Sequence, residues 1–93
     1  MRFKQAIQIG DNVTDIMRLP CIRGAFKYPF NEPYNRFPLR GHHPKKDEII
    51  YCLRLGAVDD FVQKGEWICE DYNGDWHILN NKEYINLIQQ DNE

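Results

Sequence analysis

The residues of this chain with the most reactive side chains are three cysteines and three histidines. His42 and His43 are adjacent in a GHHP stretch, and the three cysteines stand far apart. A zinc site needs ligands at spacings such as C-x₂-C with H-x₃₋₅-H, so that four side chains converge tetrahedrally. Neither set has that spacing, so the sequence predicts no metal site. We expect Cys21, Cys52 and Cys69 to be unpaired, buried as small hydrophobic residues in a reducing compartment.

Catalysis by a nucleophile or by paired acids requires side chains within hydrogen-bond reach of each other. The best pair is Cys69 with His77, but the hairpin register inferred below places them on opposite faces and sets His77 against Glu70. The acidic pairs at 59–60 and 70–71 are chain neighbours, which point to opposite faces of a strand. No phosphate-binding loop, dinucleotide fingerprint or nucleophile elbow is present. We therefore expect no enzyme activity and no cofactor.

Charge is distributed unevenly along a chain whose net charge is −2. Residues 1–22 carry a net charge of +1, residues 23–46 carry +5 and residues 47–93 carry −8. The middle segment combines six basic residues with four prolines and five aromatic residues. Its predicted binding residues are the basic and aromatic side chains Arg23, Lys27, Tyr28, Tyr34, Arg36, Phe37 and Arg40.

This segment favours binding over catalysis. We predict a non-enzymatic protein-interaction module whose partner is a protein with an acidic patch. The alternative is a module that binds single-stranded nucleic acid, with basic residues on phosphates and rings stacked on bases. The acidic remainder of the chain would repel that second ligand. The acidic half is also a candidate partner for the basic segment of a second copy, which would give a homodimer.

The N-terminal third predicts a strand, a helix and then a long loop. Alternating apolar and polar residues indicate a half-buried strand over 3–9. Asp11 or Asn12 is expected to cap a helix that ends before Pro20. The apolar stripe of that helix consists of Val13, Ile16 and Met17. Because proline removes a backbone donor, residues 23–46 are predicted to form neither a long helix nor a central strand, but a loop held to the body by some of its rings.

The C-terminal half predicts further strands and a helix. Residues 47–55 carry apolar side chains on both faces, which is typical of a central strand, and residues 56–65 read as a turn and a short strand. Asn73-Gly74 then predicts a two-residue type I′ turn. Its register pairs Cys69 with Ile78 and places the core face on Trp67, Cys69, Trp76 and Ile78. A short helix follows, capped by Asn80 or Asn81, with Tyr84, Leu87 and Ile88 on one stripe.

Together these patterns predict a single α+β domain over residues 1–93. Its elements are a small, mainly antiparallel sheet, short helices near both ends and the long proline- and aromatic-rich loop. No apolar run approaches the roughly 20 residues that span a bilayer, and the N-terminus is too polar for a secretory signal. We therefore expect a cytoplasmic protein with no membrane contact.

Two blocks of the sequence resemble a known group of proteins. "AIQIGDN" at residues 6–12 and "VQKGEWICEDYNGDWHILNNKEYINL" at 62–87 are similar to small phage and prophage-encoded proteins with a Gly-Asp-Trp/Tyr hairpin. Glu66 stands where that family usually has aspartate, and residues 20–46 have no counterpart. The resemblance implies a small accessory protein of a bacterial genome or mobile element. It implies no catalytic residues.

Overall fold

Six strands and two helices make up the part of the chain that this computed structural model describes, residues 3–29 and 43–91. The elements in chain order are β1 (Gln5–Gln8), α1 (Val13–Met17), β2 (Ile22–Lys27), β3 (Ile49–Leu55), β4 (Val58–Val62), β5 (Trp67–Glu70), β6 (Trp76–Leu79) and α2 (Asn81–Asp91). All strand pairs are antiparallel. The α+β prediction is confirmed.

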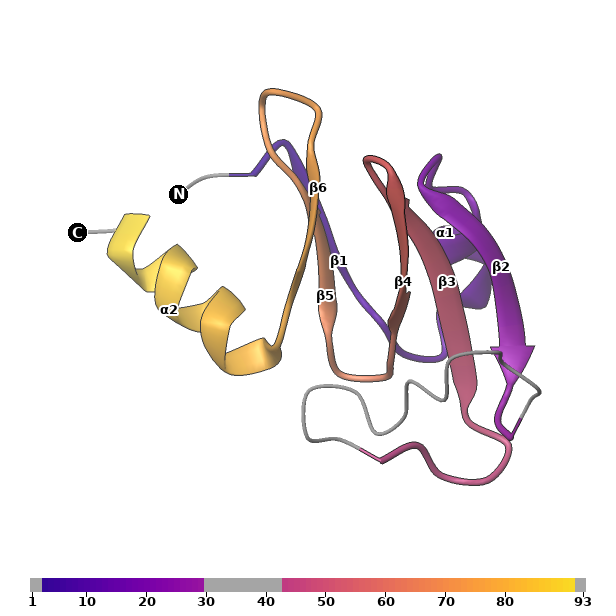
Figure 1. Ribbon diagram of the computed structural model, residues 1–93. Helices are drawn as coiled ribbons and strands as arrows, with labels where there is room; N and C mark the ends of the chain where they lie inside the picture. Colours follow the sequence, from indigo (N-terminus) through magenta and orange to yellow (C-terminus); the bar gives the residue numbers. More distant parts are fainter. Residues whose placement is uncertain (1–2, 30–42, 92–93) are drawn as a thin grey trace.

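The strands divide into two three-stranded sheets. The first has the order β1-β5-β6 and the second the order β2-β3-β4. In Figure 1, α2 lies at the end of the molecule next to the first sheet, and α1 lies with β2 and β3 at the other end. The short β4–β5 turn and the β1–α1 connection join the two sheets at the lower edge of this view.

One apolar core takes side chains from both sheets. Ile68 of the first sheet and Tyr51, Leu53 and Val62 of the second are fully buried in the same cluster, which also contains Ile16 of α1. Half-buried residues of the first sheet, Ile7, Trp76 and Ile78, pack against this cluster. Each sheet therefore covers the apolar face of the other, as thin domains of this size require.

The first strand and helix follow the sequence pattern only in part. Ile9 and Ile16 are buried as expected, but Val13 and Met17 are 42% and 45% exposed. A helix of five residues has little more than one turn, so only one residue of the predicted apolar stripe is buried in the core. Asn12 flanks the helix without capping it. Its Oδ1 accepts the Gly10 N–H at 3.0 Å instead, which closes the turn after β1.

The predicted long loop begins later than expected. Residues 22–27 form β2, which pairs with β3 and carries an irregularity between Ile22 and Gly24. The proline argument excludes a central strand, but β2 lies at the end of its sheet order. Pro29, the first proline of the segment, follows the strand and does not interrupt it.

The β5–β6 register differs by one residue from the predicted one. Gly74 has a φ of +87°, but Asn73 does not have a positive φ, and a type I′ turn requires both. The Gly74 N–H donates to the Asp71 carbonyl at 3.1 Å, and the Asp71 N–H donates to the Asp75 carbonyl at 3.0 Å. The loop therefore contains three residues, 72–74, with glycine in the left-handed position.

The extra loop residue moves the side chains of β6 to the other face of the sheet relative to β5. Cys69 is paired with His77, and Ile68 with Ile78. The predicted core face is therefore wrong. Trp76 and Ile78 face the shared core with Ile68, whereas Trp67 and Cys69 lie on the face that α2 approaches.

The C-terminal helix is capped at its first turn and held against β5 by contacts with Trp67. The Glu83 N–H donates to Asn80 Oδ1 at 2.8 Å, and the Asn80 N–H donates to Glu83 Oε1 at 2.9 Å. This reciprocal pair is a capping box, so Asn80 is the cap. Trp67 Nε1 donates to Asn81 Oδ1 at 3.0 Å, and the Trp67 and Tyr84 rings stack with centroids 3.7 Å apart.

Candidate functional site

Backbone hydrogen bonds bring the two ends of the basic segment together. The Tyr28 N–H donates to the Glu48 carbonyl at 2.8 Å, and the Asp47 N–H donates to the Tyr28 carbonyl at 2.7 Å. Lys27, at the end of β2, is paired in register with Ile49 at the start of β3. Residues on both sides of the segment thus meet at one end of the second sheet.

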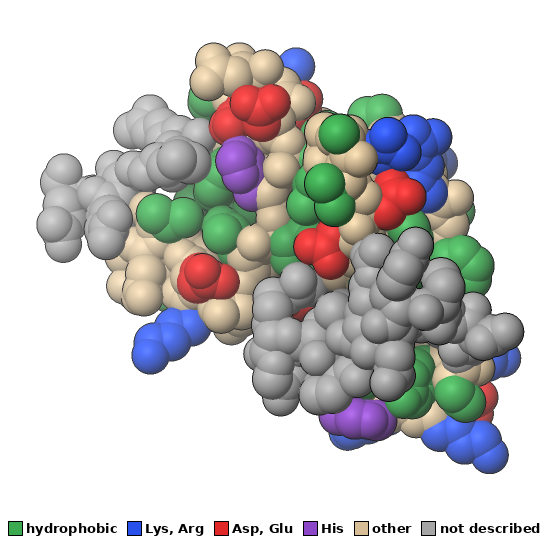
Figure 2. Space-filling model, in the orientation of Figure 1, with side chains coloured by type: hydrophobic (Ala, Val, Ile, Leu, Met, Phe, Trp, Pro, Cys, Tyr) green, Lys and Arg blue, Asp and Glu red, His purple; other side chains and the backbone are tan. Residues whose placement is uncertain are grey.

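Three exposed basic side chains on these ends form what we call the basic surface: Lys27, Lys45 and Lys46. The predicted binding residue Arg23 is also exposed, but it lies at the start of β2, beside the Cys52–Leu53 part of β3, and is not brought to this end of the sheet. The ion pairs found between described residues include none of them. Figure 2 shows lysine and arginine side chains gathered at the lower right end of the molecule, where β2 and β3 meet in Figure 1. These charges are therefore exposed to solvent and available to an external anion.

The other predicted binding residues have different positions. Tyr28 is half-buried, because its ring packs against the small cluster of Ile50 and Phe61 and forms a T-shaped pair with the His43 ring, with centroids 5.7 Å apart. This contact confirms that a ring of the segment packs on the body. The predicted residues Tyr34, Arg36, Phe37 and Arg40 lie outside the described part of the chain.

A cavity of about 480 Å³ lies beside the basic surface. Its walls come from Gly10, Asp11 and Val13 after β1, from residues 45–49, and from Lys64 in the β4–β5 turn. These segments are far apart in the sequence, but their connections lie at the same lower edge in Figure 1. The cavity thus belongs to the junction of the two sheets.

The charged side chains of this cavity are three lysines and three carboxylates: Lys45, Lys46, Lys64, Asp11, Asp47 and Glu48. Glu48 is held by the protein, because its Oε1 accepts the Lys45 N–H at 3.3 Å and its Oε2 accepts from Gln63 Nε2 at 3.3 Å. Lys64 lies 4.0 Å from Asp11, and both side chains are largely exposed. Such a long, solvated pair contributes little energy. Asp47 is a further exposed carboxylate of the lining, so the charges of the cavity balance.

The sequence does not identify Lys64 or the 10–13 turn as parts of a site. Lys64 is a single basic residue in an acidic half, and its position beside Lys45 follows only from the packing of the two sheets. Asp11 is predictable as a turn residue, but nothing in its surroundings signals a cavity.

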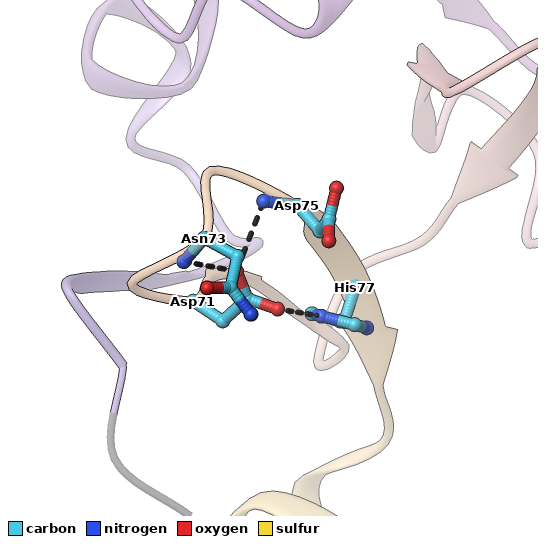
Figure 3. A network of polar contacts seen from close by, with 4 residues as sticks. All are labelled: Asp71, Asn73, Asp75 and His77. Carbon is cyan, nitrogen blue, oxygen red and sulfur yellow. Dashed lines mark hydrogen bonds and ion pairs between the residues drawn. The ribbon is translucent and has the colours of Figure 1, made fainter.

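A second polar cluster closes the tip of the β5–β6 hairpin (Figure 3). Asp71 Oδ1 accepts the backbone N–H groups of Asn73 at 2.9 Å and Asp75 at 3.0 Å, and its Oδ2 lies 2.8 Å from His77 Nε2. Because a carboxylate only accepts, Nε2 must be the protonated nitrogen. In Figure 3 the Asp75 carboxylate points away from Asp71, so only its backbone takes part.

These hydrogen bonds change the pKa of Asp71. The bond from His77 lowers it most and the bond from the Asp75 N–H adds to the effect, so the pKa lies below its ordinary value of 3.8. The carboxylate is therefore the form that holds the loop together. This cluster is a structural brace of the hairpin and replaces the predicted contact between His77 and Glu70.

Cys69 and His77 share a face, contrary to the predicted register, because they are direct cross-strand partners. Their pairing does not activate the thiol. Cys69 is fully buried, and burial raises its pKa to about 11. Since the thiolate is the nucleophile, a raised pKa keeps Cys69 inert. Burial likewise raises the pKa of Cys21 to about 11.

The cysteines match their predicted state in most respects. Cys21 and Cys69 are buried, Cys52 is half-buried, and all three are free thiols. Among residues 3–29 and 43–91, no group of three or more histidine, cysteine or acidic side chains is arranged to hold a metal ion. No helix in the same ranges has the length and apolar character to cross a membrane.

Comparisons with protein-family models, with curated proteins and with solved structures give no match to this chain.

Proposed function

We propose that this protein is a non-enzymatic interaction module that binds an acidic patch on a protein partner through its basic surface. The observation that carries the proposal is that Lys27, Lys45 and Lys46 are exposed at the same end of the second sheet, with no ion pair to a described residue. Arg23, exposed at the start of β2, belongs to the proposal as a further basic residue of the segment. Arg36 and Arg40, outside the described residues, belong to the same proposal. So does the accessory role that the resemblance to phage and prophage-encoded proteins implies.

Electrostatics favour a local acidic patch over an extended polyanion. Complementary charges steer association and set the orientation of the partners. The remainder of the chain is acidic, with a net charge of −8 over residues 47–93. A long polyanion would meet that repulsion, whereas a protein can present its acidic side chains to the basic surface alone.

Charge reversal tests the proposal. Partners captured by the protein would be identified by mass spectrometry, purified, and titrated against wild type and the double variant Lys27→Glu/Lys46→Glu. We expect the partner to have an acidic patch, and its binding to weaken with the variant and with added salt. The matched control is Lys82→Glu on α2, an exposed lysine outside the basic surface. Equal affinity for wild type and double variant would refute the role of this surface.

The alternative ligand is a single-stranded nucleic acid. Phe26 is 42% exposed on β2, and exposed rings and basic residues are the side-chain types that stack on bases and meet phosphates. Fluorescence anisotropy with a labelled single-stranded oligonucleotide distinguishes the two candidates. Binding that weakens steeply between low and physiological salt would favour this alternative. An unchanged anisotropy at low salt would remove it.

A further inference from the structure

The outer strand of the second sheet, β2, has an open edge. It lies at one end of the sheet order β2-β3-β4 and forms the right-hand border of the described chain in Figure 1. Alternate residues of such a strand direct their backbone N–H and carbonyl groups toward the neighbouring strand, and the residues between them direct theirs away from it. An edge of this kind is a template for a further strand.

The hydrogen bonds of the sheet identify the residues of β2 that face this edge. The Tyr28 N–H donates to the Glu48 carbonyl at 2.8 Å, so the backbone of Tyr28 is directed toward β3. Phe26, two residues earlier in the same register, is directed the same way. Ala25 and Lys27 therefore direct their N–H and carbonyl groups away from β3. Among the described residues, no hydrogen bond from outside the strand ladder reaches these groups.

The opposite edge of the same sheet is protected. Tyr51 of β3 is paired with Ala25 on one side and with Val62 on the other. Since its hydrogen bonds are directed away from β2, they are made with Val62, and the next residue of β4, Phe61, faces outward. The Phe61 N–H donates to Asp60 Oδ1 at 2.7 Å, so a side chain already occupies this outward donor. The exposed residues 25–27 of β2 have no such protection between described residues.

The charges along β2 select the kind of strand that fits there. Arg23 and Lys27 are exposed near the two ends of the open edge. A second copy that paired antiparallel through its own Ala25 would bring Lys27 close to Arg23 of the other copy, and facing like charges are destabilising. A strand with acidic side chains meets opposite charges instead. Phe26, which is 42% exposed, offers its ring to an apolar side chain between them.

We propose that β2 binds the acidic region of the protein partner as an extended segment, which adds to the three-stranded sheet as a further strand. The backbone groups of Ala25 and Lys27 pair with the segment, and its acidic side chains meet Arg23 and Lys27. In strand addition, main-chain hydrogen bonds supply affinity and side chains supply specificity. The inference rests on the proposed function for the acidity of the partner, and it adds a backbone contact that charge alone does not require.

Two N-methylated peptides test the backbone contact on the wild-type protein. The parent is a blocked peptide of alternating glutamate and valine; one derivative is N-methylated on its glutamates and the other on its valines, so both keep the charge of the parent. An added strand directs only alternate N–H groups toward β2. One derivative is therefore expected to bind at least about tenfold more weakly than the other. Equal affinity of both derivatives, or no binding of the parent, would overturn the proposal.

A variant of the edge tests the same contact from the side of the protein. Ala25→Pro removes an outward N–H but no charge and no bond to β3, and edge strands tolerate proline at such a position. It is expected to weaken binding of the parent peptide about fivefold. The matched control is Ala25→Val, which keeps the N–H and should keep the affinity. The amide spectrum shows whether each variant is folded, and the peptide pair decides if Ala25→Pro is not.

The outcomes separate this inference from the proposed function. If Lys27→Glu/Lys46→Glu weakens binding of the partner but the two N-methylated peptides bind equally, the contact is made by side chains alone. The proposed function then stands and the added strand is refuted. If the charge reversal has no effect on the partner, the proposed function itself fails. Slow hydrogen exchange at the Ala25 and Lys27 amides without peptide would place a second copy on this edge and would also contradict the proposal.

Discussion

Tyr51 is a core residue with a polar atom that has no hydrogen-bond partner among the described residues. Burial, and to a lesser degree the charge of Asp11, raises the pKa of its hydroxyl. The neutral form is therefore retained in the core. A buried hydroxyl without a partner costs free energy, so the aromatic ring, and not the oxygen, accounts for the contribution of this residue to stability.

Replacing Tyr51 with phenylalanine should keep the packing and remove the unpaired hydroxyl. We expect the free energy of unfolding to stay the same or to rise by about 1 kcal/mol. Urea denaturation measures the change, with Tyr72→Phe at the exposed hairpin tip as the control that should have no effect. A loss of more than about 1 kcal/mol would mean that the hydroxyl has a stabilising partner.

Asp71 should contribute to stability in a pH-dependent way. Its pKa is lowered in the folded protein, so its contribution is present above the ordinary value of 3.8 and is lost as the pH falls through the lower folded value. Asp71→Asn should therefore destabilise the protein at pH 7, and the difference from wild type should shrink below about pH 4. Denaturation curves at pH 7, 5 and 3 test this. Asp75→Asn leaves the Asp71 bonds in place and should keep the wild-type pH dependence.

At the scale of the elements, local signals placed both helices and every strand except β2, and the hairpin turn decided which residues of β5 and β6 share a face. The Asn-Gly pair correctly marked a hairpin, but the Asp71 side chain binds two backbone N–H groups of the loop and stabilises a three-residue turn. Because side chains alternate along a strand, this one-residue difference changed the face of Trp76 and Ile78 relative to Trp67.

The C-terminal helix should depend on its capping box. Asn80→Ala removes the acceptor of the Glu83 N–H and is expected to lower the free energy of unfolding by about 1 kcal/mol. Asn86→Ala, the same substitution at an exposed position inside α2, is the control. It should be neutral or slightly stabilising, since alanine has the higher helix propensity. Equal losses in both variants would contradict the role of the cap.

At the scale of the whole molecule, the shared core predicts that the two sheets unfold together. Leu53 belongs to the second sheet, whereas both tryptophans lie in the first. Leu53→Ala should lower the free energy of unfolding by about 2–5 kcal/mol, and tryptophan fluorescence should report the same shifted transition as circular dichroism. Val58→Ala, a substitution at an exposed site, should change the free energy of unfolding by less than about 0.5 kcal/mol. Two separate transitions would contradict the predicted single domain.

The sequence by itself determined the class and the local elements. Period-two alternation identified β1 and β3, the Asn80-Asn81 pair marked the start of α2, and the basic middle segment indicated the exposed cations Arg23 and Lys27. These features depend on neighbours within a few residues, so composition and spacing are sufficient to predict them. The free state of the three cysteines also followed from their number and spacing.

Only the tertiary structure decided the division into two sheets, the strand at residues 22–27, the faces of β5 and β6, and the cavity. The proline content of the basic segment did not reveal β2, because the first proline follows this strand. An edge strand also needs backbone hydrogen bonds on one side only, so prolines nearby do not exclude it. The cavity joins residues 10–13, 45–49 and 64, whose contact depends on how the two sheets pack across their common core. Long-range packing of that kind leaves no periodic signal in the sequence.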